Sequence, residues 1–295
     1  MKEMFVTKNF TAHSLAIISQ ANEILIEYED QGFDLSLRQL YYQFVARGYI
    51  ENSQRSYKNL GGIIADARLA GLIDWDTIKD RGRRAVTLNH WSNPADALDT
   101  IAKYFHIDKW QYQSSHIWIM VEKQALEGVL IPICQELDVT FIANKGYSSA
   151  STMYETGKIF ENDDRDPIVF YLGDHDPSGI DMTRDVQERL EMFAGRCVEV
   201  KRLALNMDQI EQYNPPPNPA KETDARFGNY VDKFGETCWE LDALNPTTLA
   251  ALIRDAIAEY RDDDAWNEAV QREDGMRDQL LKYAASYRRN HRKAN

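Results

Sequence analysis

The sequence predicts a mixed α/β protein in two parts, a helical N-terminal part and a larger part built on a mostly parallel β-sheet. Apolar side chains recur at helical spacing through the first 72 residues, and from Ser115 short runs rich in Val, Ile and Phe alternate with helical stretches. With 295 residues, 43% of them hydrophobic, the chain can bury one large core or two modest ones. The segment LNHWSNPADALD is the best boundary, near residue 92, so we expect domains at residues 1–92 and 93–295.

The N-terminal part is expected to hold three helices and a short basic hairpin. The helical segments are HSLAIISQANEILIEYEDQG (13–32), SLRQLYYQFVARG (36–48) and SYKNLGGIIADARLAGL (56–72). Ser36 is placed to cap the second helix and Gly48 to end it. Residues 73–88, IDWDTIKDRGRRAVTL, have the turn residues and alternation of a hairpin. Three helices and a basic hairpin together predict a winged helix-turn-helix.

The second part has the alternation of strands and helices that is typical of a parallel sheet. The predicted strands lie in HIWIMVE (116–122), VTFIAN (139–144), PIVFYLGD (167–174) and CVEVKRLAL (197–205). Strands joined by helices predict right-handed crossovers and a sheet that is covered on both faces. Residues 207–246, with three consecutive prolines, are expected to form an ordered arm or an extended excursion. An acidic helix with the basic tail YRRNHRKAN follows. Neither the proline-containing segment nor the basic tail is assigned a role beyond structure.

The composition of the chain indicates the cellular compartment in which we expect the protein. A charged and then apolar leader is not seen, and no apolar run approaches the roughly 20 residues that cross a bilayer, so we expect neither secretion nor a membrane span. The expected location is the cytoplasm, at the nucleoid if the protein is cellular. Cys134, Cys197 and Cys238 lack disulfide or metal-ligand spacing and are predicted to be buried thiols. The histidines lack ligand spacing, which argues against zinc.

The net charge of −13 argues against a nucleic-acid partner, but the charge is unevenly distributed. Residues 38–91 hold nine Lys and Arg against five Asp and Glu, an excess of +4. We therefore expect a DNA-binding face on this module, with one helix in a groove and the hairpin along the backbone. The alternative is a solvated charged surface. The candidate DNA-binding residues are Arg55, Lys58, Arg68, Lys79, Arg81, Arg83 and Arg84.

Three carboxylates are predicted to meet at one edge of the sheet. Glu122 ends the first strand, and Asp174 and Asp176 follow the third in the segment GDHDPSG. Carboxyl ends of parallel strands gather ligands, and like charges so close favour a shared cation, with all-oxygen ligands suiting Mg²⁺ or Mn²⁺. Lys123 is placed to meet a phosphate beside the metal. The alternative is that the two aspartates form a turn and cap the next helix.

These motifs resemble those of a known family. The segments IMVEKQA and GDHDPSGID resemble the magnesium-binding Toprim domain, and with LRQLYYQF before them the chain resembles the topoisomerase VI A subunit and its meiotic double-strand-break relatives. The resemblance covers roughly residues 13–245 and implies a winged-helix domain followed by a Toprim-like domain. It also implies that Tyr42 is the nucleophile, that Arg38 is the family arginine, and that Glu122, Asp174 and Asp176 hold metal. Taken alone, Tyr41 and Tyr42 fit ordinary buried or rim aromatics of an amphipathic helix.

The resemblance implies Mg²⁺-dependent DNA transesterification through a 5′-phosphotyrosyl link, in a homodimer in which the tyrosine of one subunit faces the metal of the other. A phenol with a pKa near about 10 needs a cationic neighbour and a metal to act at neutral pH, and Arg38 lies one helical turn before Tyr42. Two alternatives stay open: a metal-dependent nuclease that uses water, and a non-catalytic DNA-binding protein.

The chain departs from the family pattern in two ways. His175 stands between the aspartates where the family has glycine, and the chain has the reduced length of the "mini-A" relatives. The sequence has no Gly-rich phosphate loop, so ATP-driven strand passage would need a separate ATPase subunit.

Overall fold

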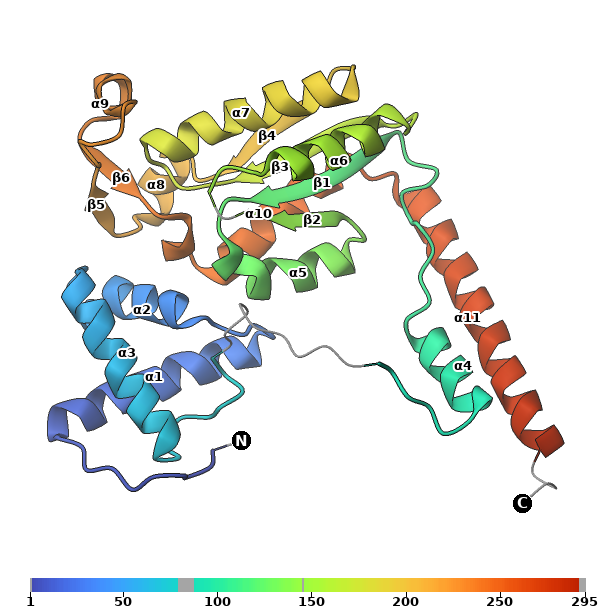
Figure 1. Ribbon diagram of the computed structural model, residues 1–295, viewed down its shortest axis with the longest axis horizontal. Helices are drawn as coiled ribbons and strands as arrows, with labels where there is room; N and C mark the ends of the chain where they lie inside the picture. The colour runs from blue at the N-terminus through green and yellow to red at the C-terminus, as the bar shows by residue number, and fades with distance from the viewer. Residues whose placement is uncertain (1, 79–87, 145, 292–295) are drawn as a thin grey trace.

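The computed structural model is a mixed α/β structure and describes residues 2–78, 88–144 and 146–291. Its centre is a four-stranded parallel sheet in the order β2-β1-β3-β4 (Figure 1). The strands are β1 (Ser115–Val121), β2 (Thr140–Ala143), β3 (Asp166–Leu172) and β4 (Glu199–Ala204). The predicted parallel sheet is therefore confirmed. The strand order reverses between β1 and β3, so their carboxyl ends form the switch point where ligands of such sheets bind.

Helices cover both faces of the sheet, as the near-continuous apolar strands require. One face packs on α6 (Ala150–Glu161) and α7 (Pro177–Ala194) through Met120, Phe160 and Leu190. The other face packs on α5 (Glu127–Glu136) and α10 (Pro246–Ala258), where Ile119 and Ile253 are fully buried. A short 3-10 turn, η1 (Gln124–Leu126), connects β1 to α5.

The N-terminal part forms its own core. It contains α1 (Ala12–Asp30), α2 (Leu37–Ala46) and α3 (Gln54–Leu69). Ser36 caps α2 as expected: its hydroxyl accepts from Gln39 N, and the Gln39 side chain accepts from Ser36 N in return. The buried apolar residues of these helices cluster together, and Ala243 from the α/β part joins them. The division near residue 92 stays a prediction.

The described beginning of the predicted hairpin is not a strand. Residues 73–78 form bends, with one isolated parallel bridge between Leu35 and Ile78. Local bonds replace a strand ladder, because Asp74 Oδ1 accepts from Asp76 N at 2.9 Å and Arg68 donates to the Trp75 carbonyl at 2.6 Å. Residues 79–87 lie outside the described residues, so the winged-helix arrangement stays a prediction.

The segment with three prolines is ordered, as expected. Its elements are α8 (Met207–Tyr213), β5 (Pro217–Pro219), α9 (Phe227–Phe234), β6 (Thr237–Trp239) and η2 (Leu241–Ala243). Strands β5 and β6 pair antiparallel. This segment lies at the end of the sheet where β1 and β3 finish (Figure 1).

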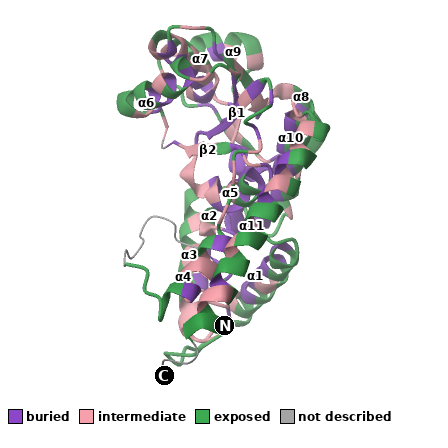
Figure 2. Ribbon diagram, turned by 90° about the vertical axis from the view of Figure 1, so that its right-hand side faces the viewer, coloured by how far each residue is buried: buried purple, intermediate pink, exposed green. Residues whose placement is uncertain are grey.

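Two helices project from the body side by side. They are α4 (Pro94–Lys103) and α11 (Asp263–His291), and Figure 2 shows that much of α11 is exposed (Figures 1 and 2). Of the cysteines, Cys134 is buried as expected, but Cys197 is exposed and Cys238 is half-buried. Cys197 lies in the loop before β4, and Cys238 lies on the short strand β6. Among the described residues, no helix has the length and apolar character that crossing a bilayer requires.

Candidate metal and tyrosine site

The site begins where β1 and β3 end side by side. Val121 pairs with Leu172, which places Glu122 next to the turn that starts at Gly173. Glu122 Oε2 accepts from Asp174 N at 2.9 Å, so the first predicted carboxylate holds the backbone of the second. The turn is tight, because a Cβ atom at Gly179 would lie 2.2 Å from the Asp174 carbonyl oxygen. Glycine is therefore needed at position 179.

Asp174 is buried, and each carboxylate oxygen has a different partner. Oδ2 lies 2.7 Å from Lys123 Nζ, and Oδ1 accepts from Leu241 N at 2.8 Å. Burial raises the pKa of Asp174 above its usual range, and the nearby charge of Glu122 adds to this effect while Lys123 opposes it. Burial also raises the pKa of Glu122. Both carboxylates are therefore held in surroundings that favour an additional positive charge.

Asp176 has the role that the alternative interpretation predicted. It is the N-cap of α7, and its Oδ1 accepts from Gly179 N at 2.6 Å and from the Ser178 hydroxyl at 3.0 Å. Asp174 faces Lys123 instead. Although the two aspartates are separated by only one residue, they have different partners.

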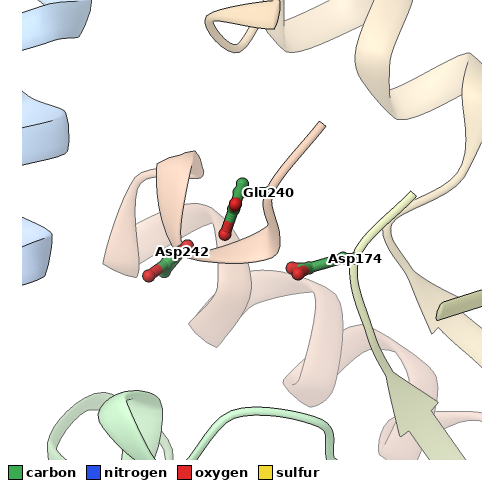
Figure 3. Close-up of side chains that lie close together, drawn as sticks. All are labelled: Asp174, Glu240 and Asp242. Atoms are coloured by element: carbon green, nitrogen blue, oxygen red, sulfur yellow. The ribbon is translucent and has the colours of Figure 1, made fainter. Parts of the chain in front are cut away.

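Two acidic residues that sequence reasoning missed complete a different group. Glu240 and Asp242 lie on either side of Leu241, directly after β6. Among the described residues, ligand oxygens of Asp174, Glu240 and Asp242 lie within 4.8 Å of one another (Figure 3). We call these three the acidic triad. The segment WELDAL does carry a signal, two acids one residue apart like Asp174 and Asp176, but the proline-containing segment around it was assigned only a structural role.

Lys123 lies at the centre of the acidic triad. Its ammonium contacts Asp174, Glu240 and, at 3.1 Å, Asp242. Burial opposes the charge of Lys123, but Asp242, Asp174 and Glu240 outweigh that effect and hold its pKa above the usual range. The charge of Lys123 therefore partly neutralises the triad, and its predicted contact with a phosphate stays a prediction.

The N-terminal helix α2 reaches the same site. Arg38 Nη2 lies 2.8 Å from Glu240 Oε2, and Arg38 Nε lies 3.0 Å from Asp242 Oδ2. The guanidinium also lies 5.7 Å from the centre of the Tyr42 ring. Tyr42 is buried, and burial together with Asp242 and Glu240 raises its pKa above the usual range, against the opposing effects of Arg38 and Lys123. The structure therefore brings the predicted tyrosine and arginine to the carboxylates of the α/β part.

His175 fastens the segment that carries the acidic triad to the turn after β3. Its backbone exchanges hydrogen bonds with Trp239, at 2.9 and 3.0 Å, and its Nδ1 lies 2.8 Å from the Tyr230 hydroxyl. The ring packs against Tyr230, Phe234 and Trp239. Burial lowers the pKa of His175 to about 4, so the ring is neutral at pH 7. His175 therefore acts in this turn through packing and hydrogen bonds and not through charge.

Arg202 holds the turn after β3 through hydrogen bonds to its backbone. This half-buried side chain donates to the carbonyls of Gly173 at 2.9 Å, Asp174 at 2.6 Å and Gly179 at 2.9 Å. Counted with Arg38 and Lys123, it gives the site three bases against five acids, a net charge of −2 if all are ionised. The five acids are Glu122, Asp174, Asp176, Glu240 and Asp242. One divalent cation would balance this charge, and the all-oxygen donors fit Mg²⁺ or Mn²⁺.

The predicted DNA-binding residues that the structure describes differ in how exposed they are. Arg55 and Lys58 are exposed on α3. Arg68 is partly buried, stacks on Trp75 at 4.5 Å from the ring centre, and holds the turn described above. The remaining four, Lys79, Arg81, Arg83 and Arg84, lie outside the described residues.

Comparison with known proteins adds no assignment: no protein-family model matches the chain, and a search of curated proteins found no match.

Proposed function

We propose that this chain cleaves DNA by metal-dependent transesterification, with Tyr42 as the nucleophile. The observation that carries the proposal is the contact between α2 and the acidic triad. Arg38, one helical turn from Tyr42, forms ion pairs with Glu240 and Asp242, which are about 200 residues away in sequence. A tyrosine, an arginine, a lysine and a carboxylate cluster thereby share one site.

The reaction exchanges one phosphodiester bond for another. The Tyr42 oxygen forms a bond to a backbone phosphorus, the bond from phosphorus to the 3′ oxygen breaks, and the phenolic proton is lost as the 3′ hydroxyl gains one. Arg38 and Lys123 would stabilise the charge that develops on the phosphate. A divalent cation bound by the acidic triad would neutralise its carboxylates and stabilise the leaving oxygen. As long as Asp242 and Glu240 are not neutralised in this way, they raise the pKa of Tyr42 and disfavour the reactive phenolate.

Specific observations favour two other functions. The burial and raised pKa of Tyr42 favour a nuclease in which metal-activated water, and not the phenol, attacks the phosphate. The position of the Lys123 ammonium among the three carboxylates favours a non-catalytic protein, because a lysine can take the place of a metal ion structurally. In that case the chain would bind DNA without cleaving it.

One experiment separates the three functions. The protein is incubated with supercoiled DNA and Mg²⁺, the reaction is stopped with detergent, and the products are run on denaturing gels with and without protease. We expect protein-linked 5′ ends that are lost in Tyr42→Phe. Tyr41→Phe is the matched control, because Tyr41 is the adjacent buried tyrosine and its hydroxyl bonds only to Asn52 and Ser53. Free ends in both variants would indicate the nuclease, and intact DNA with wild-type protein would indicate the binding protein.

A further inference from the structure

The two projecting helices form an antiparallel arm, which we define as α4 and α11. The direction follows from contacts along their length. Arg288, near the end of α11, lies 3.1 Å from Asp96 at the start of α4, and Arg277 donates to the Ala102 carbonyl at 3.2 Å. Figure 1 shows the arm extending away from the sheet.

The apolar core of the arm is thin. The buried apolar residues of α4 and α11 are all alanines: Ala95, Ala102, Ala269 and Ala284. A buried methyl group removes little apolar area from water, so these contacts stabilise a helix pair only weakly. An isolated pair of helices is also marginal on conformational grounds. The arm therefore gains stability if another surface packs on it.

One side of the arm exposes large apolar side chains. Ile101 is 50% exposed, Tyr104 67%, Met276 39% and Tyr283 65%. Ile101, Met276 and Tyr283 stand one position before Ala102, Arg277 and Ala284, which are buried or contact the other helix. Tyr104, the C-cap of α4, stands one position before Phe105, whose carbonyl accepts from Arg277. In an antiparallel pair, positions that precede the contact residues by one lie on the same side of both helices. These four residues therefore form one continuous face, which we call the apolar face of the arm.

The charges on α11 identify the partner that fits this face. Residues 263–277 contain five acids and two Lys or Arg, a net charge of −3, whereas residues 278–291 contain one acid and three Lys or Arg, a net charge of +2. A second α11 placed antiparallel against the first aligns each acidic half with a basic half. A parallel arrangement would align like charges.

We propose that two copies of this chain associate through the apolar face of the arm, with the two α11 helices antiparallel and the two arms forming a four-helix bundle. Each copy supplies the same face and both charge halves, so a single two-fold axis satisfies the apolar and the charged contacts together. The dimer does not depend on DNA cleavage, and its test needs no activity.

Sedimentation velocity of the full chain tests the association. We expect wild-type protein to sediment as a dimer at micromolar concentration. The double variant Met276→Glu, Tyr283→Glu should sediment as a monomer, and so should the single variant Ile101→Glu, which changes the other helix. Gln271→Glu is the matched control, because Gln271 is exposed, lies five residues before Met276 and so points to a different side of α11, and should leave the dimer intact. Wild-type protein that stays monomeric, or a dimer that survives both sets of changes, would overturn the proposal.

Cysteine cross-linking tests the direction of the helices and does not depend on the charge variants. Met276 and Tyr283 are seven residues apart, about 10 Å along a helix, which is too far for a disulfide within one chain. In a background with Cys197→Ser and Cys238→Ser, the double variant Met276→Cys, Tyr283→Cys should form linked dimers on oxidation. Neither single variant should do so. Linked dimers of a single variant, or no link in the double variant, would overturn the antiparallel pairing.

Discussion

One oxygen of Asp174 contacts a lysine and the other accepts from a backbone amide, whereas Asp176 caps a helix. Substitutions at these two residues therefore test which carboxylates bind a cation. If the acidic triad holds a cation, Mg²⁺ should raise the melting temperature of the wild type by mass action, equivalent to about 2.7 kcal/mol at a hundred times the Kd. Asp174→Asn and Asp242→Asn should each abolish this increase, and Asp176→Asn should retain most of it. Thermal melts with and without Mg²⁺ measure the effect.

The opposite response of these variants to Mg²⁺ would identify a different set of ligands. Loss of the Mg²⁺ effect in Asp176→Asn, with retention in Asp242→Asn, would restore the ligand set predicted from sequence, Glu122, Asp174 and Asp176. That result would also show that the Asp242 carboxylate serves only as a partner for Lys123 and Arg38.

His175 contributes through packing and not through charge. Because its ring is buried against Tyr230, Phe234 and Trp239, His175→Gly should cost roughly 3 kcal/mol of unfolding free energy through the cavity that it leaves. Tyr230→Phe removes only the hydroxyl that contacts His175 and should cost about 1 kcal/mol. Urea denaturation measures both. A His175→Gly protein as stable as the wild type would show that the ring does not hold this turn through packing.

A buried carboxylate of α11, Glu273, contacts the segment that connects α4 to β1. Burial alone would raise the pKa of Glu273, but the hydrogen bond from Ile107 N and the contacts with Lys109 and His106 outweigh burial and lower the pKa to about 2. Arg277 also lies 2.7 Å from this carboxylate. The ionised form of Glu273 is therefore stabilised in the folded protein.

This lowered pKa predicts how the stability of the arm depends on pH. The unfolded chain protonates Glu273 near its ordinary pKa of 4.5, whereas the folded chain does so only near about 2. The stabilisation is present above pH 4.5 and is lost as the pH falls toward 2. Glu273→Gln should therefore melt well below the wild type at pH 7, and the gap should narrow as the pH is lowered from 5 to 3. A gap that stays constant over this range would contradict the assignment.

At the scale of the whole molecule, an acidic protein is expected to bind DNA through its basic module. Arg55→Glu with Lys58→Glu, on exposed positions of α3, should weaken binding to duplex DNA and reduce the slope of log K against log salt by roughly 2. Fluorescence anisotropy at several salt concentrations measures this slope. The same change of charge at Lys158 and Lys201, on α6 and β4, is the control and should have a smaller effect on the slope. Equal effects from both pairs would place the DNA elsewhere.

The docking of α2 on the α/β part determines where a complete site can form. The family resemblance implies a tyrosine that works on the partner subunit, but here Arg38 and Tyr42 lie beside the carboxylates of their own chain. From this arrangement we expect that a mixture of inactive Tyr42→Phe and inactive Asp174→Asn proteins stays inactive after subunit exchange. Plasmid nicking by a verified heterodimer, under conditions in which wild type cleaves, would instead show that the site is shared between subunits.

The parallel sheet and the helices that cover it follow from local patterns in the sequence. Buried parallel strands are continuous apolar runs, so the segment HIWIMVE predicts the strand that is seen at Ser115–Val121, and Ser36 predicts the start of α2 through its local capping bonds. The proximity of Glu122 and Asp174 also follows from the sequence, because the ends of adjacent parallel strands must meet at one edge of the sheet.

The other side chains of the site join Glu122 and Asp174 through contacts that form only when the chain folds. Glu240 and Asp242 reach Asp174 because His175 and Trp239, 64 positions apart, exchange backbone hydrogen bonds, and no local periodicity encodes such a pairing between loops. The same holds for the capping role of Asp176 and for the carbonyl contacts of Arg68, since each depends on which backbone group comes within reach after folding. Local patterns specify which face of an element is buried, whereas contacts between loops depend on how the packed elements place their ends.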